Sequence, residues 1–191
     1  MIRGRSGGRK SPPRRRANLA APTGSHDGAG GTMTPRVSIT TEGQERTEGL
    51  AIRPCRAEEC EAVLALWRRA GAIPSATDTL EELTRLVRSA HGDGFLVAVR
   101  SGSIVGSVIG GWDGWRGNIY RLAVAPEARR RGLARRLVRE AERVLWRKGA
   151  RRLSALVERH EAQAVAFWDA LADAGYQRDP RMMRYVKALT A

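Results

Sequence analysis

The sequence is poor in the residues that support several common classes of protein. Only two of its 191 residues are cysteine, at positions 55 and 60, and only three are histidine. Two cysteines cannot build the dense disulfide framework of a small secreted domain, and no spacing among these residues matches a zinc site. The sequence therefore predicts reduced thiols, no bound metal and a cytoplasmic protein.

Long hydrophobic runs are also missing. The best candidate, residues 101–112, has 12 residues and contains four glycines, whereas a membrane-spanning helix needs about 18 apolar residues. Hydrophobic residues make up 42% of the chain and charged residues 28%, which is typical of a globular domain that does not enter a membrane.

Acidic residues are absent from the first 16 positions, which hold seven basic ones. Residues 17–48 are rich in glycine, threonine, serine and proline and show no apolar period. Such a segment cannot bury enough surface to offset its ordering entropy, so we expect 1–48 to be a disordered tail and 49–191 to be the folded domain. Three hypotheses for the tail remain open: a genuine basic arm, a mitochondrial-type transit peptide, or a true start at Met33.

The charge that is present is strongly positive, with a formal net charge of +14. Residues 114–152 alone hold 13 basic and three acidic residues. A basic stripe of this kind fits phosphate, either on a nucleic acid or on a cofactor. The sequence has no signature of an RNA-recognition, KH or helix-turn-helix domain, and its aromatic residues are not interleaved with the stripe. We therefore do not expect nucleic acid to be the partner.

Hydrophobic periodicity from residue 50 onward predicts a mixed α/β domain. Apolar residues at helical spacing indicate helices, and β-rich runs bounded by glycine or proline indicate strands. Thr77 or Asp78 is expected to cap the second helix. The predicted strands are 50–53, 95–99, 103–110, 118–124, 153–157 and 182–186, and the predicted helices are 56–70, 79–90, 133–146 and 161–174. This order predicts a mixed sheet with helices packed on its faces.

The most informative segment follows the strand 118–124. Pro126 ends that strand, a short arginine-rich loop follows, and a helix starts near Gly132. The first amides of a helix have no internal partner and carry partial positive charge, so they bind phosphate when the backbone is accessible. Gly132 and Ala134 leave room for that approach, and arginines supply further donors. The alternative is a solvated basic loop before an ordinary surface helix.

At this point the sequence resembles a known family. Leu122-Ala-Val-x-Pro126 followed by Arg129-x-x-Gly132-x-Ala134 is similar to the acyl-CoA signature of the GNAT superfamily of N-acyltransferases. A second block, Glu161-x-x-Ala164-x-x-Phe167-Trp168 leading to Gly175-Tyr176, is similar to a later motif of that family. The likeness spans about residues 50–187. It implies a GNAT fold, with a mostly antiparallel mixed sheet, helices on both faces, and splayed fourth and fifth strands.

The resemblance also implies a binding mode for acetyl-CoA. Main-chain groups of Leu122 and Val124 would pair with the pantetheine arm, and the Val124 amide would stabilise the developing oxyanion. Amides from Arg130 to Arg135 would hold the pyrophosphate. The residues expected at the cofactor are Leu122, Ala123, Val124, Arg129, Arg130, Arg131, Gly132, Leu133, Ala134 and Arg135.

The catalytic acid and base are less sharply indicated. Trp168 stands where family members often have a tyrosine acid, and an indole N–H cannot supply that proton. Tyr120, Tyr176 or water would have to replace it. Tyr120, Asp113 and Glu158 are candidates for the base that deprotonates the amine, and each is equally well explained as an ordinary surface residue. Trp112 and Trp115, set among glycines, either line an acceptor pocket or cover a hairpin bend.

These patterns predict an acetyl-CoA-dependent N-acetyltransferase that acts on a primary amine. A small amine is the leading acceptor, and a protein N-terminus or lysine is second. The alternatives are an acyl-CoA-binding regulator without catalytic activity and a basic nucleic-acid-binding protein. A homodimer is compatible with the expected fold.

Overall fold

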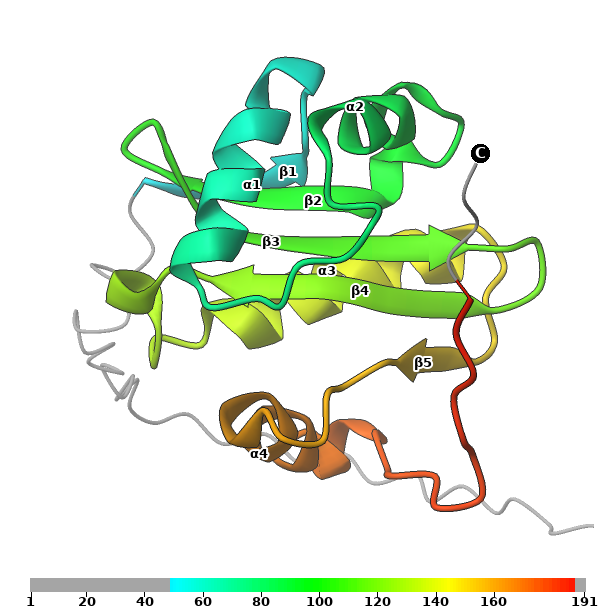
Figure 1. The fold of residues 1–191 in the computed structure, drawn as a ribbon. Coiled ribbons are helices and arrows are strands. Elements are labelled where there is room, and N and C mark those ends of the chain that lie inside the picture. Colours follow the sequence, from blue (N-terminus) through cyan, green and yellow to red (C-terminus); the bar gives the residue numbers. More distant parts are fainter. Residues whose placement is uncertain (1–48, 188–191) are drawn as a thin grey trace, which may run out of the picture. The chain divides into compact units, whose positions relative to one another are not determined.

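The structure is a computed structural model that describes residues 49–187 (Figure 1). The tail expected at 1–48 lies outside these described residues. The strands are β1 (Leu50–Pro54), β2 (Phe95–Arg100), β3 (Ser103–Trp112), β4 (Gly117–Val124) and β5 (Leu153–Ala155). The α-helices are α1 (Cys60–Arg69), α2 (Leu80–Arg88), α3 (Leu133–Arg147) and α4 (Ala162–Asp169). Single 3₁₀ turns at Ala57–Glu59, Gly92–Gly94, Pro126–Ala128 and Ala172–Ala174 connect them.

The five strands form one sheet in the order β1-β2-β3-β4-β5. Strands β1 to β4 pair with one another in antiparallel fashion, and β5 runs parallel to β4. Only three residues of β4, Gly117 to Ile119, pair with β5. Beyond them the two strands part, and the chain continues from β5 to α4 (Figure 1). The mixed, mostly antiparallel sheet with splayed fourth and fifth strands is therefore confirmed.

Helices cover both faces of the sheet, as expected. Helices α1 and α2 lie on one face and α3 lies behind the other (Figure 1). The apolar residues of α3 recur every three or four positions, which places them on the side of the helix that packs on the sheet. Its buried residues are Leu133, Leu137, Val138, Ala141, Val144 and Leu145.

The start of α2 differs from the sequence prediction. Thr79, rather than Thr77 or Asp78, is the N-cap, and its side-chain oxygen accepts a hydrogen bond of 3.2 Å from the Glu82 amide. Asp78 instead accepts a hydrogen bond from the Ser75 amide (2.8 Å) and forms an ion pair with Arg121. The carboxylate is used in a long-range contact that local sequence does not reveal.

The last predicted strand is wrong. Residues 182–186 form no strand, and Met183 and Tyr185 are 76% and 88% exposed. A strand needs a neighbour to complete its hydrogen bonds, and β5, the strand at this edge of the sheet, has only three residues. The predicted helix 161–174 is also shorter, because it ends at Asp169 and a 3₁₀ turn follows.

Within residues 49–187, no helix has the length and apolar character needed to cross a membrane. Within the same residues, no three histidine, cysteine, aspartate or glutamate side chains lie close enough together to hold a metal ion.

Candidate active site

The second half of β4 has an open edge. The Ala125 amide donates to the Val105 carbonyl of β3 (2.9 Å), and the direction of main-chain groups alternates along a strand. The N–H and C=O of Val124 therefore point away from β3. Since β5 pairs only with Gly117 to Ile119, these groups face the edge where the two strands have parted. The main-chain groups of Leu122 point to the same edge.

A β-bulge lies in β4 just before this edge. The register between β3 and β4 shifts between Ser107 and Ile109, and Arg121 opposite has a φ of 48°. The Ser107 hydroxyl donates to the Arg121 carbonyl (3.3 Å). Such a bulge adds a residue and re-aims the strand.

The loop after β4 turns directly into α3. Gly132 is the N-cap of the helix with a φ of 74°, and Arg130 also has a positive φ of 63°. The Arg136 amide donates to the Gly132 carbonyl (3.1 Å), so the amides of the three residues between them precede the first intrahelical bond. The first turn of α3 contains no acidic residue. This end of a 15-residue helix can therefore accept an anion.

The reason for glycine at position 132 is more specific than the sequence indicated. A Cβ built there meets no atom within 4 Å, so crowding by the protein does not select glycine. The left-handed backbone selects it, because a side chain at this φ is strained. The position is exposed, which leaves the helix end accessible.

The predicted arginines divide into two groups. Arg129 is bound to the protein: its guanidinium donates to the carbonyls of Val124 (3.1 Å) and Ala70 (2.8 Å) and to Gln163 Oε1 (3.3 Å). Arg135 donates to the Ala170 carbonyl and lies 3.5 Å from Asp173.

Arg130 and Arg131 form the second group. Both are exposed, and no hydrogen bond or ion pair to them occurs among the described residues. Of the other predicted cofactor positions, Ala123 and Leu133 are buried in the core, and Leu122, Val124 and Ala134 are partly buried. Leu133 can therefore bind only through its main-chain groups, and the main-chain groups of Ala123 face β3.

Tyr120 lies on the face of the sheet that carries α1 and α2. A Cβ on Gly110 would point at Leu145 of α3, whereas one on Gly111 would point at the Tyr120 ring, 2.9 Å from Cε2. Tyr120 is 38% exposed. Burial raises the pKa of its phenol; the charge of Arg184 opposes this shift and that of Asp113 adds to it. Tyr120 is thus a protonated phenol, near Asp113, beside the open edge.

The other two catalytic candidates lie in different surroundings. Asp113 Oδ1 accepts hydrogen bonds from the amides of Arg116 (2.6 Å) and Trp115 (2.8 Å), which lower the pKa of this carboxyl. It stabilises the turn of the β3–β4 hairpin, and Trp115 at that turn is 71% exposed. Glu158 is exposed in the turn that precedes α4.

Trp168 belongs to an aromatic cluster that joins α4 to α3. Its ring centroid lies 5.4 Å from that of Phe167 and 4.9 Å from that of Tyr176. The Tyr176 hydroxyl donates to Glu142 Oε1 (2.8 Å). Burial, with this hydrogen bond, raises the pKa of Tyr176 far above its usual range. Because its hydroxyl proton is already donated to Glu142, Tyr176 is a poor candidate for the acid.

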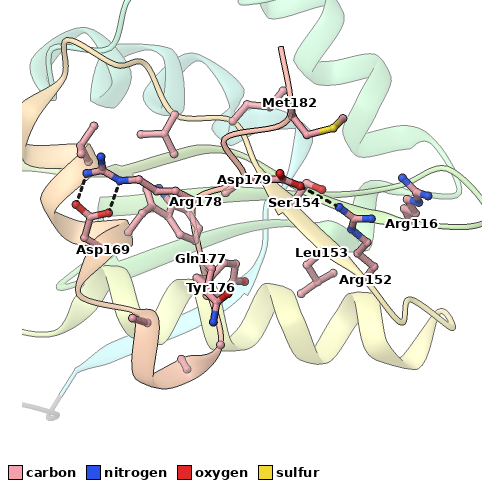
Figure 2. Close-up of a pocket in the computed structure, with 18 of the residues that line it drawn as sticks. Arg116, Arg152, Leu153, Ser154, Asp169, Tyr176, Gln177, Arg178, Asp179 and Met182 are labelled. Carbon is pink, nitrogen blue, oxygen red and sulfur yellow. Dashed lines mark hydrogen bonds and ion pairs between the residues drawn. The ribbon is translucent and has the colours of Figure 1, made fainter. Parts of the chain in front are cut away.

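A groove of about 2620 Å³ runs along β5 and α4 and is bordered by the segment 174–185 (Figure 2). Within it, Arg178 pairs with Asp169 (2.5 Å) and Arg152 lies 3.8 Å from Asp179. Glu158 and Trp168 line this groove, whereas Tyr120, Asp113 and the start of α3 do not. The structure therefore places Tyr120 on β4, within the electrostatic influence of Asp113, and places Glu158 in the groove along β5 and α4.

Sequence reasoning missed Arg121. Its guanidinium donates to the Ile73 carbonyl (3.0 Å), forms the ion pair with Asp78, and lies 5.2 Å from the centre of the Trp67 ring. All three partners are at least 43 positions away in the sequence, so no local motif reveals the contacts.

Comparison with known proteins agrees with this architecture. The sequence pattern of the acetyltransferase (GNAT) family matches residues 60–172. An acetyltransferase of Pectobacterium atrosepticum is 34% identical over 122 residues, which cover 64% of this chain and 86% of that protein. One from Sodalis glossinidius is 32% identical over 122 residues, with 64% and 85% covered. The chain belongs to the acetyltransferase (GNAT) family and is an acyltransferase.

Solved structures share the fold at lower identity. An aminoglycoside N-acetyltransferase in complex with CoA is 18% identical, with 73% of this chain and 95% of that chain covered, at a TM-score of 0.58. The PaiA N-acetyltransferase of Thermoplasma acidophilum, in complex with coenzyme A, is 21% identical, with 63% and 87% covered, at a TM-score of 0.56. At these identities the likeness establishes the fold alone.

Proposed function

We propose that this protein transfers the acetyl group of acetyl-CoA to a primary amine, by direct attack of the amine while both substrates are bound. One observation carries the proposal: the open edge of β4 ends at Val124, and the chain turns from there into the accessible N-terminus of α3 at Gly132. An extended arm that ends in a pyrophosphate fits this combination, because the edge offers main-chain pairing and the helix end offers amides. We assign this activity to residues 49–191 and place the protein in the cytoplasm.

The residues of the loop and helix would hold the donor. The amides of Gly132, Leu133 and Ala134 bind the pyrophosphate, and the exposed Arg130 and Arg131 supply charge-assisted hydrogen bonds. Arg135 stays near its Ala170 contact and flanks the same site. Arg129 would support this site through its hydrogen bond to Val124, which fixes the end of β4.

The edge of β4 would orient the reacting group. Acetyl-CoA supplies the activated thioester, and the protein supplies positioning and dipoles. The Val124 carbonyl is already bound by Arg129, which leaves its N–H to stabilise negative charge on the thioester oxygen. Leu122 offers both its N–H and its C=O to the arm. Ala123, whose main-chain groups face β3, supports this edge from within the sheet.

The proton transfers would involve Tyr120 and a carboxylate. The raised pKa of Tyr120 keeps its phenol protonated, so it can donate to the departing thiolate. Asp113 is held in the hairpin turn, and its negative charge favours the protonated form of Tyr120. Glu158 is the candidate base, acting through water from the far side of the opening.

The acceptor is proposed as a small amine, with a protein N-terminus as the second candidate. Support for the first comes from the fold shared with aminoglycoside acetyltransferases, and for the second from the fold shared with Ard1 of Thermoplasma volcanium (20% identity, TM-score 0.57). These likenesses favour an amine acceptor in general.

The test is acetyl transfer by the full chain. Acetyl-CoA is incubated with spermidine, kanamycin or a hexapeptide with a free amino terminus, and the acetylated amine is identified by mass spectrometry. Release of CoA together with a mass gain of one acetyl group on an amine supports the proposal. Binding of acetyl-CoA without transfer to any amine would instead indicate a regulator that binds the cofactor, and no binding would contradict the proposal altogether.

A further inference from the structure

Arg121 is the centre of a closed network on the face of the sheet that carries α1 and α2. Its guanidinium binds Asp78 and the Ile73 carbonyl and lies over the Trp67 ring. Trp67 Nε1 donates to Ser107 Oγ (2.8 Å), and the same hydroxyl donates back to the Arg121 carbonyl. Ser107 is fully buried, so the network joins α1, β3, β4 and the α1–α2 loop around a buried polar group.

The bulge in β4 is what allows this network to form beside the reaction site. In a regular strand, neighbouring side chains point to opposite faces. Tyr120 packs on Gly111, on the face opposite α3, and Arg121 contacts Trp67 of α1 on that same face. The extra residue of the bulge therefore places the proposed proton donor and the arginine side by side.

The bulge holds Arg121 in an unfavourable backbone conformation. Its φ of 48° is rare for a residue with a side chain. Such conformations persist when surrounding contacts fix them, and they cluster at functional sites. Here the contacts are identified: the Ser107 hydroxyl fixes the Arg121 carbonyl and the α1–α2 loop fixes the guanidinium.

The network holds the α1–α2 loop against β4. Figure 1 shows this connection crossing the sheet face in front of β4. Arg121 binds the loop at Ile73 and Asp78, and Arg129 donates a hydrogen bond to it at Ala70. Ile73 is 48% exposed although its carbonyl is fixed, so the loop presents an apolar side chain beside Tyr120's strand.

We propose that Arg121 is a positioning residue that fixes the α1–α2 loop as one wall of the acceptor site. The inference rests on the proposed amine acetylation, since that reaction places the acceptor beside Tyr120. Arg121 contacts this loop at Ile73 and Asp78 and leaves the Arg129–Ala70 hydrogen bond in place. Losing the Arg121 guanidinium is therefore expected to weaken amine binding and to spare acetyl-CoA binding.

The experiment separates the side chain of Arg121 from its backbone. Arg121→Gly keeps a residue that tolerates the positive φ but removes the guanidinium. Asp78→Ala keeps Arg121 but removes its partner, together with the Ser75–Asp78 hydrogen bond. Arg121→Val removes the guanidinium and disfavours the bulge as well. Arg151→Gly, in the exposed bend between α3 and β5, is the control for loss of one arginine.

Two readouts are made on the full chain. Hydrogen–deuterium exchange reports the mobility of residues 71–79, and kinetics with the best amine of the panel give KM for the amine and for acetyl-CoA. We expect faster exchange in 71–79 and an amine KM raised about tenfold or more in Arg121→Gly and Asp78→Ala, with the acetyl-CoA KM within about twofold. Arg121→Val should also raise the KM for acetyl-CoA, because a valine at this φ distorts the edge of β4.

Unchanged exchange in 71–79 in both variants would overturn the proposal, whatever the activity. Faster exchange with an unchanged amine KM and kcat would show that the loop is fixed by Arg121 but forms no part of the acceptor site, which also overturns it. If the wild-type protein acetylates no amine, the proposed function fails, and the role of Arg121 in acceptor binding fails with it. Should Arg121→Gly not fold, Asp78→Ala carries the same comparison.

Discussion

The Nε–H of Arg129 donates a hydrogen bond of 3.1 Å to the main-chain oxygen of Val124. The same guanidinium binds the Ala70 carbonyl at the end of α1. Arg129 therefore connects the last residue of β4 to the loop before α3 and to α1. Through these contacts, the residue that the sequence assigned to phosphate fixes the strand end whose amide faces the proposed thioester.

Arg129→Lys should weaken acetyl-CoA binding although it keeps the positive charge. A lysine cannot form the separate hydrogen bonds to Val124 and Ala70 that the planar guanidinium forms. We expect the Kd for acetyl-CoA, measured by calorimetry, to rise about tenfold, which corresponds to about 1.4 kcal/mol. Arg143→Lys, at an exposed position of α3, is the control. Equal affinity in the two variants would show that only the charge at position 129 matters.

Tyr120→Phe should lower kcat by about a hundredfold, within the range expected for loss of a general acid. The phenylalanine ring can still pack on Gly111, so KM for acetyl-CoA should stay within about twofold. Because the pKa of Tyr120 is raised, wild-type kcat should not fall until the pH exceeds the ordinary phenol value of about 10. A pH profile of kcat measures both effects. A variant with wild-type kcat would exclude Tyr120 as the proton donor.

The buried thiol of Cys55 should make the free energy of unfolding fall as the pH becomes alkaline. Burial, followed by the effects of Cys60 and Glu59, raises the pKa of its thiol to about 12. A raised folded-state pKa stabilises the fold fully below the unfolded value of about 8.5, and this stabilisation is lost as the pH rises toward 12. The urea midpoint should therefore fall between pH 8 and pH 11 more steeply in the wild type than in Cys55→Ala. Parallel pH dependence of the two proteins would contradict this expectation.

Trp67→Phe should lower the free energy of unfolding by about 1–3 kcal/mol, because Ser107 Oγ loses a buried hydrogen-bond donor. Trp67 is only 3% exposed, so the smaller ring also leaves unfilled space. Urea unfolding measures the change. The same substitution at Trp115, which is 71% exposed, should alter stability by less than about 0.5 kcal/mol. Similar losses in both variants would show that the Trp67–Ser107 bond is not responsible.

The sequence predicts the elements of the sheet and α3 because their signals are local. The turn residues predict the hairpin of β2 and β3, and the spacing of apolar residues predicts the buried face of α3. The sequence also predicted a strand at 182–186, but a strand forms only when a partner edge is long enough, and β5 is short. That condition depends on tertiary structure.

The functional details were hidden for a related reason. Arg129 reaches Ala70 across 59 positions, and Arg121 reaches Ile73 across 48. Arginines are abundant in this chain, so nothing in its composition distinguishes these two from Arg130 and Arg131, which are exposed and make no hydrogen bond within residues 49–187. Asp113 was a reasonable candidate base by position, yet its hydrogen bonds to the hairpin amides appear only once the turn is folded.

The most direct test of a cofactor site at the start of α3 is a calorimetric titration of the full-length protein with acetyl-CoA, beside the Gly132→Glu variant. A glutamate at position 132 would place a negative charge against the pyrophosphate and strain the left-handed backbone. Gly102→Glu is the matched control, since Gly102 has a similar φ of 77° and open space in the β2–β3 turn. We expect micromolar binding by the wild type and by Gly102→Glu, and none by Gly132→Glu. Equal binding by all three proteins would contradict a cofactor site at the start of α3.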